Sequence, residues 1–316
     1  MNGVVTIGEV LIDFIPMDKE ISGYIKNPGG APANVAVGVA KLGGESSFIG
    51  TVGNDLFGNY LIQMLDSYEV NTDYVFKTDE ARTQIVFVNN DENGERSFVF
   101  YVDKGADQFL SKDNICQRIF ENKNILHFGS ISLIQEPTKS AVKSAVEMAK
   151  QQGLYISFDP NIRLSMWESK EKAKDQIVEM FQWTDILKIS EEELELITGE
   201  KDIYKALKLL SQYNIPLILI TFGEKGSGYY YDQKFSKVKG IKINAIDTTG
   251  AGDAFMSAVL YQLASKGAQI NKLTNDFLDS TLKIANISGA ITASAKGAIH
   301  SLPTLPDIQK YHDIFE

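Results

Sequence analysis

Residues 247–255 combine glycines, threonines and carboxylates in one stretch, Asp-Thr-Thr-Gly-Ala-Gly-Asp-Ala-Phe. An alternating apolar segment, 241–245, precedes it and an apolar-periodic run, 254–263, follows it, so we expect a strand, a tight turn and a helix. The first amides of such a helix can bind a phosphate, because free N–H groups and the positive helix end both favour an anion. The residues of this predicted anion site are Gly250, Ala251 and Gly252.

Asp253 places a carboxylate in the first turn of the same helix. A site that only binds a polyanion gains nothing from it, whereas a site that deprotonates an attacking hydroxyl group needs one. The alternative is an aspartate that merely charges a helix start. With Asp247, Thr248 and Thr249 in front of the turn, the catalytic interpretation is favoured.

A second segment, Gly29-Gly30-Ala31-Pro32-Ala33-Asn34, joins a glycine pair to a helix start. Glycines let the backbone approach a ligand closely, and proline fits an early helical position. Asn34 offers an acceptor and two donors, which suits the hydroxyl groups of a sugar. Taken alone, the segment is equally compatible with a simple loop-to-helix junction.

Two other polar segments are expected beyond strand ends, where doubly wound sheets place their sites. Asp13 could accept hydrogen bonds from hydroxyl groups, or it could be a solvated strand-end carboxylate. Asn161 and Arg163 belong to Asp-Pro-Asn-Ile-Arg, which follows the apolar run 154–158. The planar fork of Arg163 could clamp a phosphate or sugar oxygen, with a surface salt bridge as the alternative.

Further candidates follow two more apolar runs. Ser190 and Glu193 have the spacing of a capping box, which suffices to explain them structurally. The glycine-rich segment 221–228 could make room for a nucleotide or be an ordinary turn. The candidates at this end are Lys188, Ser190, Glu193, Thr221, Gly223 and Gly226.

The elements that must position these residues alternate along the chain. Short apolar runs at 4–7, 47–49, 125–128, 154–158, 186–189 and 217–221 predict buried strands. Amphipathic segments at 33–42, 60–68, 138–152, 170–182, 204–213 and 281–295 predict helices. This order predicts an α/β fold, a doubly wound, mostly parallel sheet with helices on both faces.

Two regions interrupt this alternation. Residues 11–26 are extended, and the β-prone runs 83–89 and 96–102 flank an Asn- and Gly-containing loop, which predicts a hairpin. An inserted hairpin can serve as a lid over a site, or it can be a decorative edge.

The overall composition fits an ordinary globular protein, with 44% apolar and 23% charged residues. A net charge of −10 without a basic block argues against a nucleic-acid role. The single cysteine excludes a disulfide framework within the chain and a cysteine zinc site. Without a signal peptide or an apolar run of membrane-spanning length, we expect a cytoplasmic protein with no membrane association.

The segments at 29–34 and 247–255 together resemble the two signatures of the ribokinase-like (PfkB) carbohydrate kinases, and the resemblance extends from Val4 to Pro303. The motifs Gly105-Ala106-Asp107, Phe128-Gly129-Ser130-Ile131-Ser132 and 159–163 are most similar to the fructokinases. A P-loop is absent, and no strand is followed by the dinucleotide-binding fingerprint.

The resemblance implies a role for each candidate. Asp253 would be the catalytic base, and the amides of residues 250–252 the anion hole. Sugar contacts would come from Asp13, Gly29, Gly30, Asn34, Asn161 and Arg163. Nucleotide contacts would come from Lys188, Ser190, Thr221, Gly223, Gly226 and Asn286, while Glu193 would act indirectly on Mg²⁺. A monovalent cation, expected to be K⁺, would be held by Asp247, Thr249, Thr292, Ala295, Gly297 and Ser301.

The same resemblance implies an organisation and a reaction. The α/β core would comprise residues 1–10, 31–80 and 107–316, and the β-lid residues 11–30 and 81–106. The chain would transfer the γ-phosphoryl group of ATP to a primary hydroxyl, D-fructose being the expected sugar. A 2-keto-3-deoxygluconate kinase, a riboside kinase and a non-catalytic sugar-binding regulator are alternatives, and an NAD-dependent dehydrogenase is a remote one. A homodimer through the lid is also expected.

Overall fold

The computed structural model describes residues 3–18, 21–90 and 96–311. Its main sheet has nine strands in the order β13-β12-β11-β10-β9-β8-β1-β4-β5. All neighbours from β11 to β5 are parallel, and β12 and β13 are added antiparallel at one edge. The strands of this sheet are β1 (Gly3–Ile7), β4 (Ser46–Gly53), β5 (Asn71–Thr78), β8 (Lys123–Gly129), β9 (Tyr155–Asp159), β10 (Ile186–Ser190), β11 (Leu217–Thr221), β12 (Gly226–Tyr231) and β13 (Lys234–Lys239).

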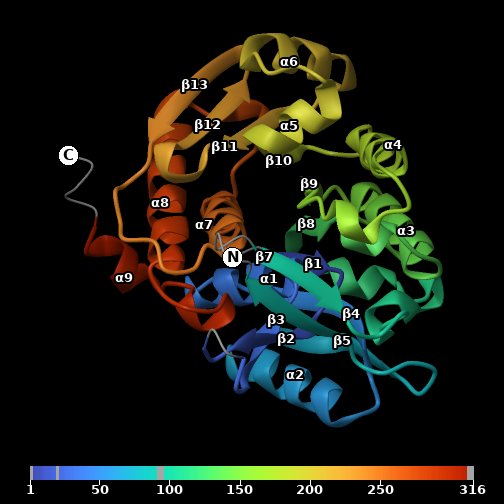
Figure 1. Cartoon of the computed structure of the whole chain (residues 1–316). Helices are drawn as coiled ribbons and strands as arrows, with labels where there is room; N and C mark the ends of the chain where they lie inside the picture. The colour runs from blue at the N-terminus through green and yellow to red at the C-terminus, as the bar shows by residue number, and fades with distance from the viewer. Residues whose placement is uncertain (1–2, 19–20, 91–95, 312–316) are drawn as a thin grey trace.

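Helices cover both faces of this sheet (Figure 1). Alternation along each strand divides the core: Val4 packs with α1, α7 and α8 on one face, and Val5 with α3, α4 and α6 on the other. The helices are α1 (Ala31–Lys41), α2 (Leu56–Ser67), α3 (Thr138–Gln151), α4 (Lys170–Phe181), α5 (Glu191–Thr198), α6 (Ile203–Leu210), α7 (Ala251–Ser265), α8 (Asn275–Ala293) and α9 (Leu305–Gln309). The predicted doubly wound architecture is confirmed.

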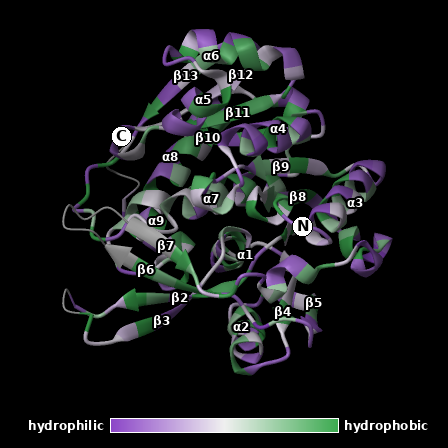
Figure 2. Ribbon diagram, turned by 45° about the vertical axis from the view of Figure 1, so that its right-hand side comes forward, coloured by the Kyte–Doolittle hydropathy of each residue, from purple (hydrophilic) through white to green (hydrophobic). Residues whose placement is uncertain are grey.

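A second sheet of four strands stands apart from the main one, in the order β3-β2-β6-β7 (Figure 2). Its strands are β2 (Leu11–Pro16), β3 (Tyr24–Gly29), β6 (Ile85–Asn90) and β7 (Arg96–Phe100). The predicted hairpin is confirmed by the antiparallel pairing of β6 with β7, while the loop at 91–95 lies outside the described residues. Phe14 and Phe87 stack at 5.3 Å between ring centroids on the face that meets α2 through Phe57. We call these four strands the small sheet.

One local prediction is wrong. Residues 241–245 do not form a strand, and the chain from the end of β13 to α7 is a loop. Its backbone bonds to the end of a helix instead of to a sheet, because Ile246 and Asp247 both donate their N–H groups to the carbonyl of Ala293. Apolar alternation there reflects partial burial, with Ile241 in the core, and not sheet pairing. Within the described residues, no helix combines the length and apolar character needed to cross a membrane.

Candidate active site

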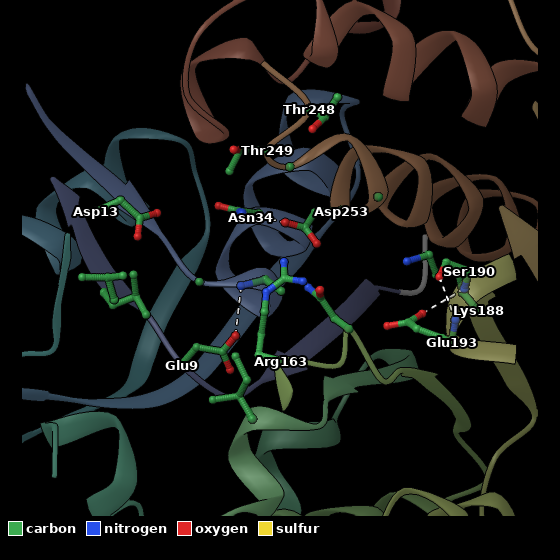
Figure 3. Close-up of a pocket in the computed structure, with 18 of the residues that line it drawn as sticks. Glu9, Asp13, Asn34, Arg163, Lys188, Ser190, Glu193, Thr248, Thr249 and Asp253 are labelled. Atoms are coloured by element: carbon green, nitrogen blue, oxygen red, sulfur yellow. Dashed lines mark hydrogen bonds between the residues drawn. The ribbon is translucent and has the colours of Figure 1, made fainter. Parts of the chain in front are cut away.

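A cavity of about 420 Å³ lies where the carboxyl ends of the central strands meet the small sheet, a volume that suits a small ligand. In Figure 3, Asn34 and Asp253 lie at its centre, Asp13 and Glu9 on one side, and Lys188, Ser190 and Glu193 on the other. The remaining lining residues are Leu11, Gly30, Ala31, Val86, Phe100, Ile131, Asn161, Arg163, Thr248, Thr249, Gly250 and Gly252. Segments far apart in the sequence therefore converge on one pocket.

Asp253 and Asn34 are joined directly inside this cavity. The Asn34 Nδ2 donates to Asp253 Oδ2 at 2.7 Å, although the residues are 219 positions apart. Both are nearly inaccessible, at 4% and 6% exposure, and the Asn34 Oδ1 is buried without a partner. A buried acceptor of this kind is costly unless it is satisfied, so a bound hydroxyl group is its natural partner.

Electrostatics tune Asp253 toward proton transfer. Burial raises the pKa of its carboxyl from 3.8 to about 6, opposed by the hydrogen bond from Asn34. Asp159 raises this pKa further, while Lys188 and Arg163 lower it. The carboxylate is thus ionised at neutral pH but basic enough to accept a proton from a hydroxyl group.

The turn before Asp253 begins helix α7 with a left-handed residue. Gly250 has φ +79°, and a Cβ there would lie 2.7 Å from the Cβ of Ala298. The first i→i−4 bond of the helix is donated by Ala254 to Gly250, so the earlier amides have no helix-internal acceptor. Ala251 donates to the carbonyl of Thr248, and both Gly250 and Gly252 line the cavity. The geometry fits the predicted anion site.

On the small-sheet side, Asp13 and the glycine pair approach each other closely. A Cβ on Gly29 would lie 2.3 Å from Asp13 Oδ2, so a glycine is needed beside this carboxylate. Gly30 has φ +108°, and a Cβ there would lie 2.4 Å from the carbonyl oxygen of Glu9. Asp13 and Gly30 line the cavity, and Gly29 adjoins it.

The segment after β9 enters the cavity from the opposite face. Asn161 adopts φ +42°, a conformation that asparagine tolerates better than most residues, and both Asn161 and Arg163 line the pocket. The backbone N–H of Ile162 donates to Glu193 Oε1 at 2.7 Å, which fixes this loop to the start of α5. Arg163 points toward Asp253 (Figure 3).

Lys188 forms a buried ion pair beneath the anion turn. Its Nζ lies 3.1 Å from Asp159 Oδ1 and 3.0 Å from Oδ2, and both side chains are nearly inaccessible. Burial alone lowers the pKa of Lys188, but Asp159 and Glu193 outweigh it and the net shift is upward. A Cβ on Gly252 would lie 3.2 Å from Lys188 Nζ, so a fixed positive charge adjoins the turn.

Ser190 and Glu193 form the predicted capping box. Glu193 N–H donates to Ser190 Oγ, and Ser190 N–H donates to Glu193 Oε2. Since Ile162 donates to the other oxygen, both oxygens of Glu193 already accept a backbone amide. Both residues line the cavity.

The other predicted nucleotide residues do not line this cavity. Thr221 ends β11 at the same edge of the sheet, and Gly223 has open space at its Cβ position. Asn286 on α8 donates to the carbonyls of Val238 and Lys239, a bond pattern that holds β13 to the helix. These residues lie farther along the edge, as a neighbouring subsite would.

The predicted cation residues lie around Asp247. Its Oδ1 accepts from Thr249 N–H at 2.8 Å and its Oδ2 from Gly297 N–H at 3.0 Å, so it ties the turn to the loop after α8. Thr292 Oγ1 donates to Ser288 O, Ser301 Oγ to Lys296 O, and Ala295 N–H to Thr292 O. No cluster of three or more His, Cys, Asp or Glu side chains suited to a metal occurs in the part of the chain described here.

Glu9 is a charged residue of the pocket that was not predicted from the sequence. It is 2% exposed, lines the cavity, and accepts a hydrogen bond from Ala31 N–H through Oε1. A signal was available, since Glu9 is a carboxylate between the apolar runs 3–7 and 10–12. His127 is buried, bonded to Ser157 Oγ and absent from the lining, so its role is structural.

Comparisons with known proteins agree with this geometry. The pfkB family of carbohydrate kinases matches residues 1–305. Probable fructokinase-2 of Arabidopsis thaliana is 41% identical over 307 residues, covering 95% of this chain and 93% of that protein. Fructokinase of Vibrio cholerae O395, solved with bound fructose, ADP and calcium ion, has a TM-score of 0.90 at 36% identity and 99% coverage of both chains. A double mutant of that fructokinase, solved with fructose, ADP and potassium ion, has a TM-score of 0.90 at 35% identity, covering 99% of this chain and 98% of the other.

Proposed function

The chain belongs to the pfkB family of carbohydrate kinases and is an ATP-dependent fructose kinase, and we propose that Asp253 is its general base. The observation that carries this assignment is the buried Asp253–Asn34 pair at the centre of a cavity whose rim carries an anion-binding turn. The primary hydroxyl of D-fructose would lie against Asp253, and the phosphates of ATP against the turn.

In the proposed reaction, Asp253 takes the proton of the sugar hydroxyl as its oxygen bonds to the γ-phosphorus. The bond from this phosphorus to the β–γ bridging oxygen breaks, and ADP leaves with the electron pair. Asn34 orients the base through its 2.7 Å hydrogen bond, and its own unpartnered Oδ1 is available to a second sugar hydroxyl.

Charge on the transferring group would be stabilised by two fixed elements. The amides of the 250–252 turn supply hydrogen-bond donors, and Lys188 adds a cation that Asp159 holds in place. Such preorganised groups are effective because they need no reorientation during the reaction. Asn161 and Arg163 would contact the sugar or the phosphate from the opposite side of the cavity.

The metals are part of this proposal. Magnesium would arrive with ATP, where it neutralises the β- and γ-oxygens. Glu193 would act there indirectly: backbone amides fix its carboxylate at the cavity edge, and its remaining lone pairs could order waters around the metal. A potassium ion would be held beside Asp247 and Thr249 by the loop containing Thr292, Ala295, Gly297 and Ser301. The residues that would contact the nucleotide are Lys188, Ser190, Thr221, Gly223, Gly226 and Asn286.

We assign residues 11–30 and 81–106 to a lid and residues 1–10, 31–80 and 107–316 to the core. Leu11, Asp13, Val86 and Phe100 of the small sheet already line one wall of the cavity. Closure of this wall over the sugar would exclude water from the reacting oxygen.

A sugar panel tests the proposal. With Mg-ATP, initial rates are measured on D-fructose, D-ribose, 2-keto-3-deoxygluconate and a riboside, each with and without K⁺. We expect the largest kcat/KM on D-fructose and a higher rate with K⁺. A larger kcat/KM on 2-keto-3-deoxygluconate or on the riboside would show that the chain has another substrate specificity within the family. If none of the sugars stimulated ATP consumption, kinase activity itself would be contradicted.

A further inference from the structure

Glu9 occupies the point where the core meets the small sheet. It lies between β1 of the main sheet and β2 of the small sheet, and it is 2% exposed. Its Oε1 accepts a hydrogen bond from Ala31 N–H at 3.1 Å, where the chain returns from β3 into helix α1. Two of the crossings between the sheets are therefore joined by one carboxyl group.

This hydrogen bond replaces a local helix cap. The N-cap of α1 is Gly30, which has no side chain to accept from the first turn. Pro32 has no N–H group and needs no acceptor. The amide of Ala31 does need one, and Glu9, 22 residues earlier, accepts its hydrogen bond. The backbone N–H of Asn34, in the same turn, donates to the carbonyl of Gly30.

The start of α1 in turn sets the catalytic pair. Asn34 lies one turn after Ala31, and its amide reaches Asp253 at 2.7 Å. Gly30 also packs its backbone against the carbonyl of Glu9, where even a Cβ would clash at 2.4 Å. A shift of Glu9 would therefore be transmitted to Asn34 through a single helical turn.

We propose that Glu9 is a positioning residue that fixes the first turn of α1 and thereby aligns Asn34 with Asp253. The inference rests on the proposed kinase reaction and deepens it. Glu9 acts through Ala31 and Asn34 and does not take part in the transfer itself.

The charge state of Glu9 fits this role. Burial raises its pKa to about 8, against the lowering effect of backbone hydrogen bonds, and nearby Asp107 and Asp253 raise it further. The neutral form keeps an acceptor oxygen for Ala31 and adds no negative charge next to the base. Glutamine should then substitute well at neutral pH, because its amide oxygen can accept the same bond.

The test compares two substitutions of similar size. Glu9→Met removes the acceptor, and Glu9→Gln keeps it. In the D-fructose and Mg-ATP assay at pH 7, we expect Glu9→Met to lower kcat/KM by about tenfold or more, the scale of one buried hydrogen bond, with Glu9→Gln within about threefold of wild type.

A pH profile separates positioning from a general structural effect. The bond from Asn34 lowers the pKa of Asp253, which also faces Asp159, Lys188 and Arg163. Misplacing Asn34 should therefore move the acidic limb of kcat/KM upward in Glu9→Met and leave it in place in Glu9→Gln. Equal activity and equal profiles for both variants would overturn the proposal, as would equal losses.

Ala31→Pro provides the same test from the donor side, because proline is tolerated at the first helical position but lacks the N–H group. We expect the double variant Glu9→Met/Ala31→Pro to have a kcat/KM no lower than that of the less active single variant, since both substitutions remove the same hydrogen bond. Additive losses would overturn the proposal. If the melting curve and ADP binding show that Glu9→Met does not fold, the proposal is tested by comparing kcat/KM and its pH profile between Ala31→Pro and Glu9→Gln. Failure of wild type to phosphorylate fructose would instead contradict the proposed function.

Discussion

At the scale of single residues, the site contains a carboxylate, that of Asp253, whose burial destabilises the folded protein when it is ionised. Burial lifts the pKa of Asp253 from 3.8 to about 6, so its ionised form opposes folding at neutral pH. This opposition is present above about pH 6 and is relieved as the pH falls through 6 toward 3.8, because the folded state then takes up the proton first. The same shift brings the base closer to the pH at which it works.

Asp253→Asn should therefore separate stability from activity. We expect kcat to fall by a factor on the order of 10² or more, the effect of losing a general base. The melting temperature at pH 7 should rise by a few degrees, since raising the pKa of Asp253 from 3.8 to about 6 costs the ionised folded state roughly 3 kcal/mol. Activity assays and calorimetry at pH 7 and pH 4 measure both, and the stability gain should vanish at the lower pH. Near wild-type kcat with intact fructose binding would remove Asp253 from the mechanism.

We assign the acidic limb of the pH profile of kcat/KM to the protonation of Asp253. We expect kcat/KM of wild type to fall as the pH drops through about 6, because protonated Asp253 cannot accept the hydroxyl proton. Asn34→Leu keeps the volume but removes the donor to Asp253, so its acidic limb should lie at higher pH. Profiles from pH 5 to 8 with fructose test this, and an unmoved limb in the variant would contradict the assignment.

At the scale of elements, function depends on how helices begin. Helices α1 and α7 both start at glycines with positive φ, Gly30 and Gly250, and neither receives a side-chain cap from its N-cap residue. Both starts border the cavity, but they differ: the first amide of α1 donates to Glu9, whereas the first turn of α7 is left to the predicted anion site. Helix α5, by contrast, carries a complete capping box and contributes Ser190 and Glu193 to the pocket edge.

Gly250→Ala should damage both stability and catalysis. An alanine there must adopt φ +79° and place its Cβ 2.7 Å from the Cβ of Ala298, so we expect destabilisation of about 2 kcal/mol or more and a large loss of kcat. Gly267→Ala is the matched control past the other end of α7, with φ +57° and open space around the Cβ. It should cost about 1 kcal/mol and leave kcat unchanged. Urea unfolding and initial rates compare the two, and equal effects would contradict a special role for the turn.

At the scale of the whole molecule, the small sheet presents apolar side chains to solvent. Ile25 of β3 and Val99 of β7 are 48% and 54% exposed, and Tyr101, directly after β7, is 71% exposed. An open sheet edge with exposed apolar residues can pair with another chain. We therefore expect a homodimer formed through the small sheet.

Sedimentation equilibrium tests this expectation. Ile25→Lys and Val99→Lys are made separately, because the two residues lie on opposite faces and on the edge strands β3 and β7. The substitution that lies in the interface should shift the protein toward the monomer, because the added charge would be buried there. Tyr204→Lys changes a residue of 70% exposure on α6, at the opposite end of the molecule (Figure 1), and should leave the mass unchanged. A wild type that is monomeric at the highest concentrations measured would refute the dimer.

The alternating core and the residue types of the proposed catalytic turn could be predicted from the amino-acid sequence. Both depend on short stretches of sequence: buried parallel strands appear as continuous apolar runs, and the glycine turn with Asp253 lies within nine residues. The loop at 241–245 imitated a strand because partial burial also produces alternation.

Which polar groups contact each other could not be predicted from the sequence and follows from the packing of the folded chain. The partners of Asn34–Asp253, Glu9–Ala31, Lys188–Asp159 and Asp247–Gly297 are separated by 219, 22, 29 and 50 positions. No local pattern encodes such pairs, because they depend on how strands order in the sheet and how helices pack across it. Glu9 escaped our sequence analysis for this reason: its role comes from an amide that the chain delivers only after passing through the small sheet.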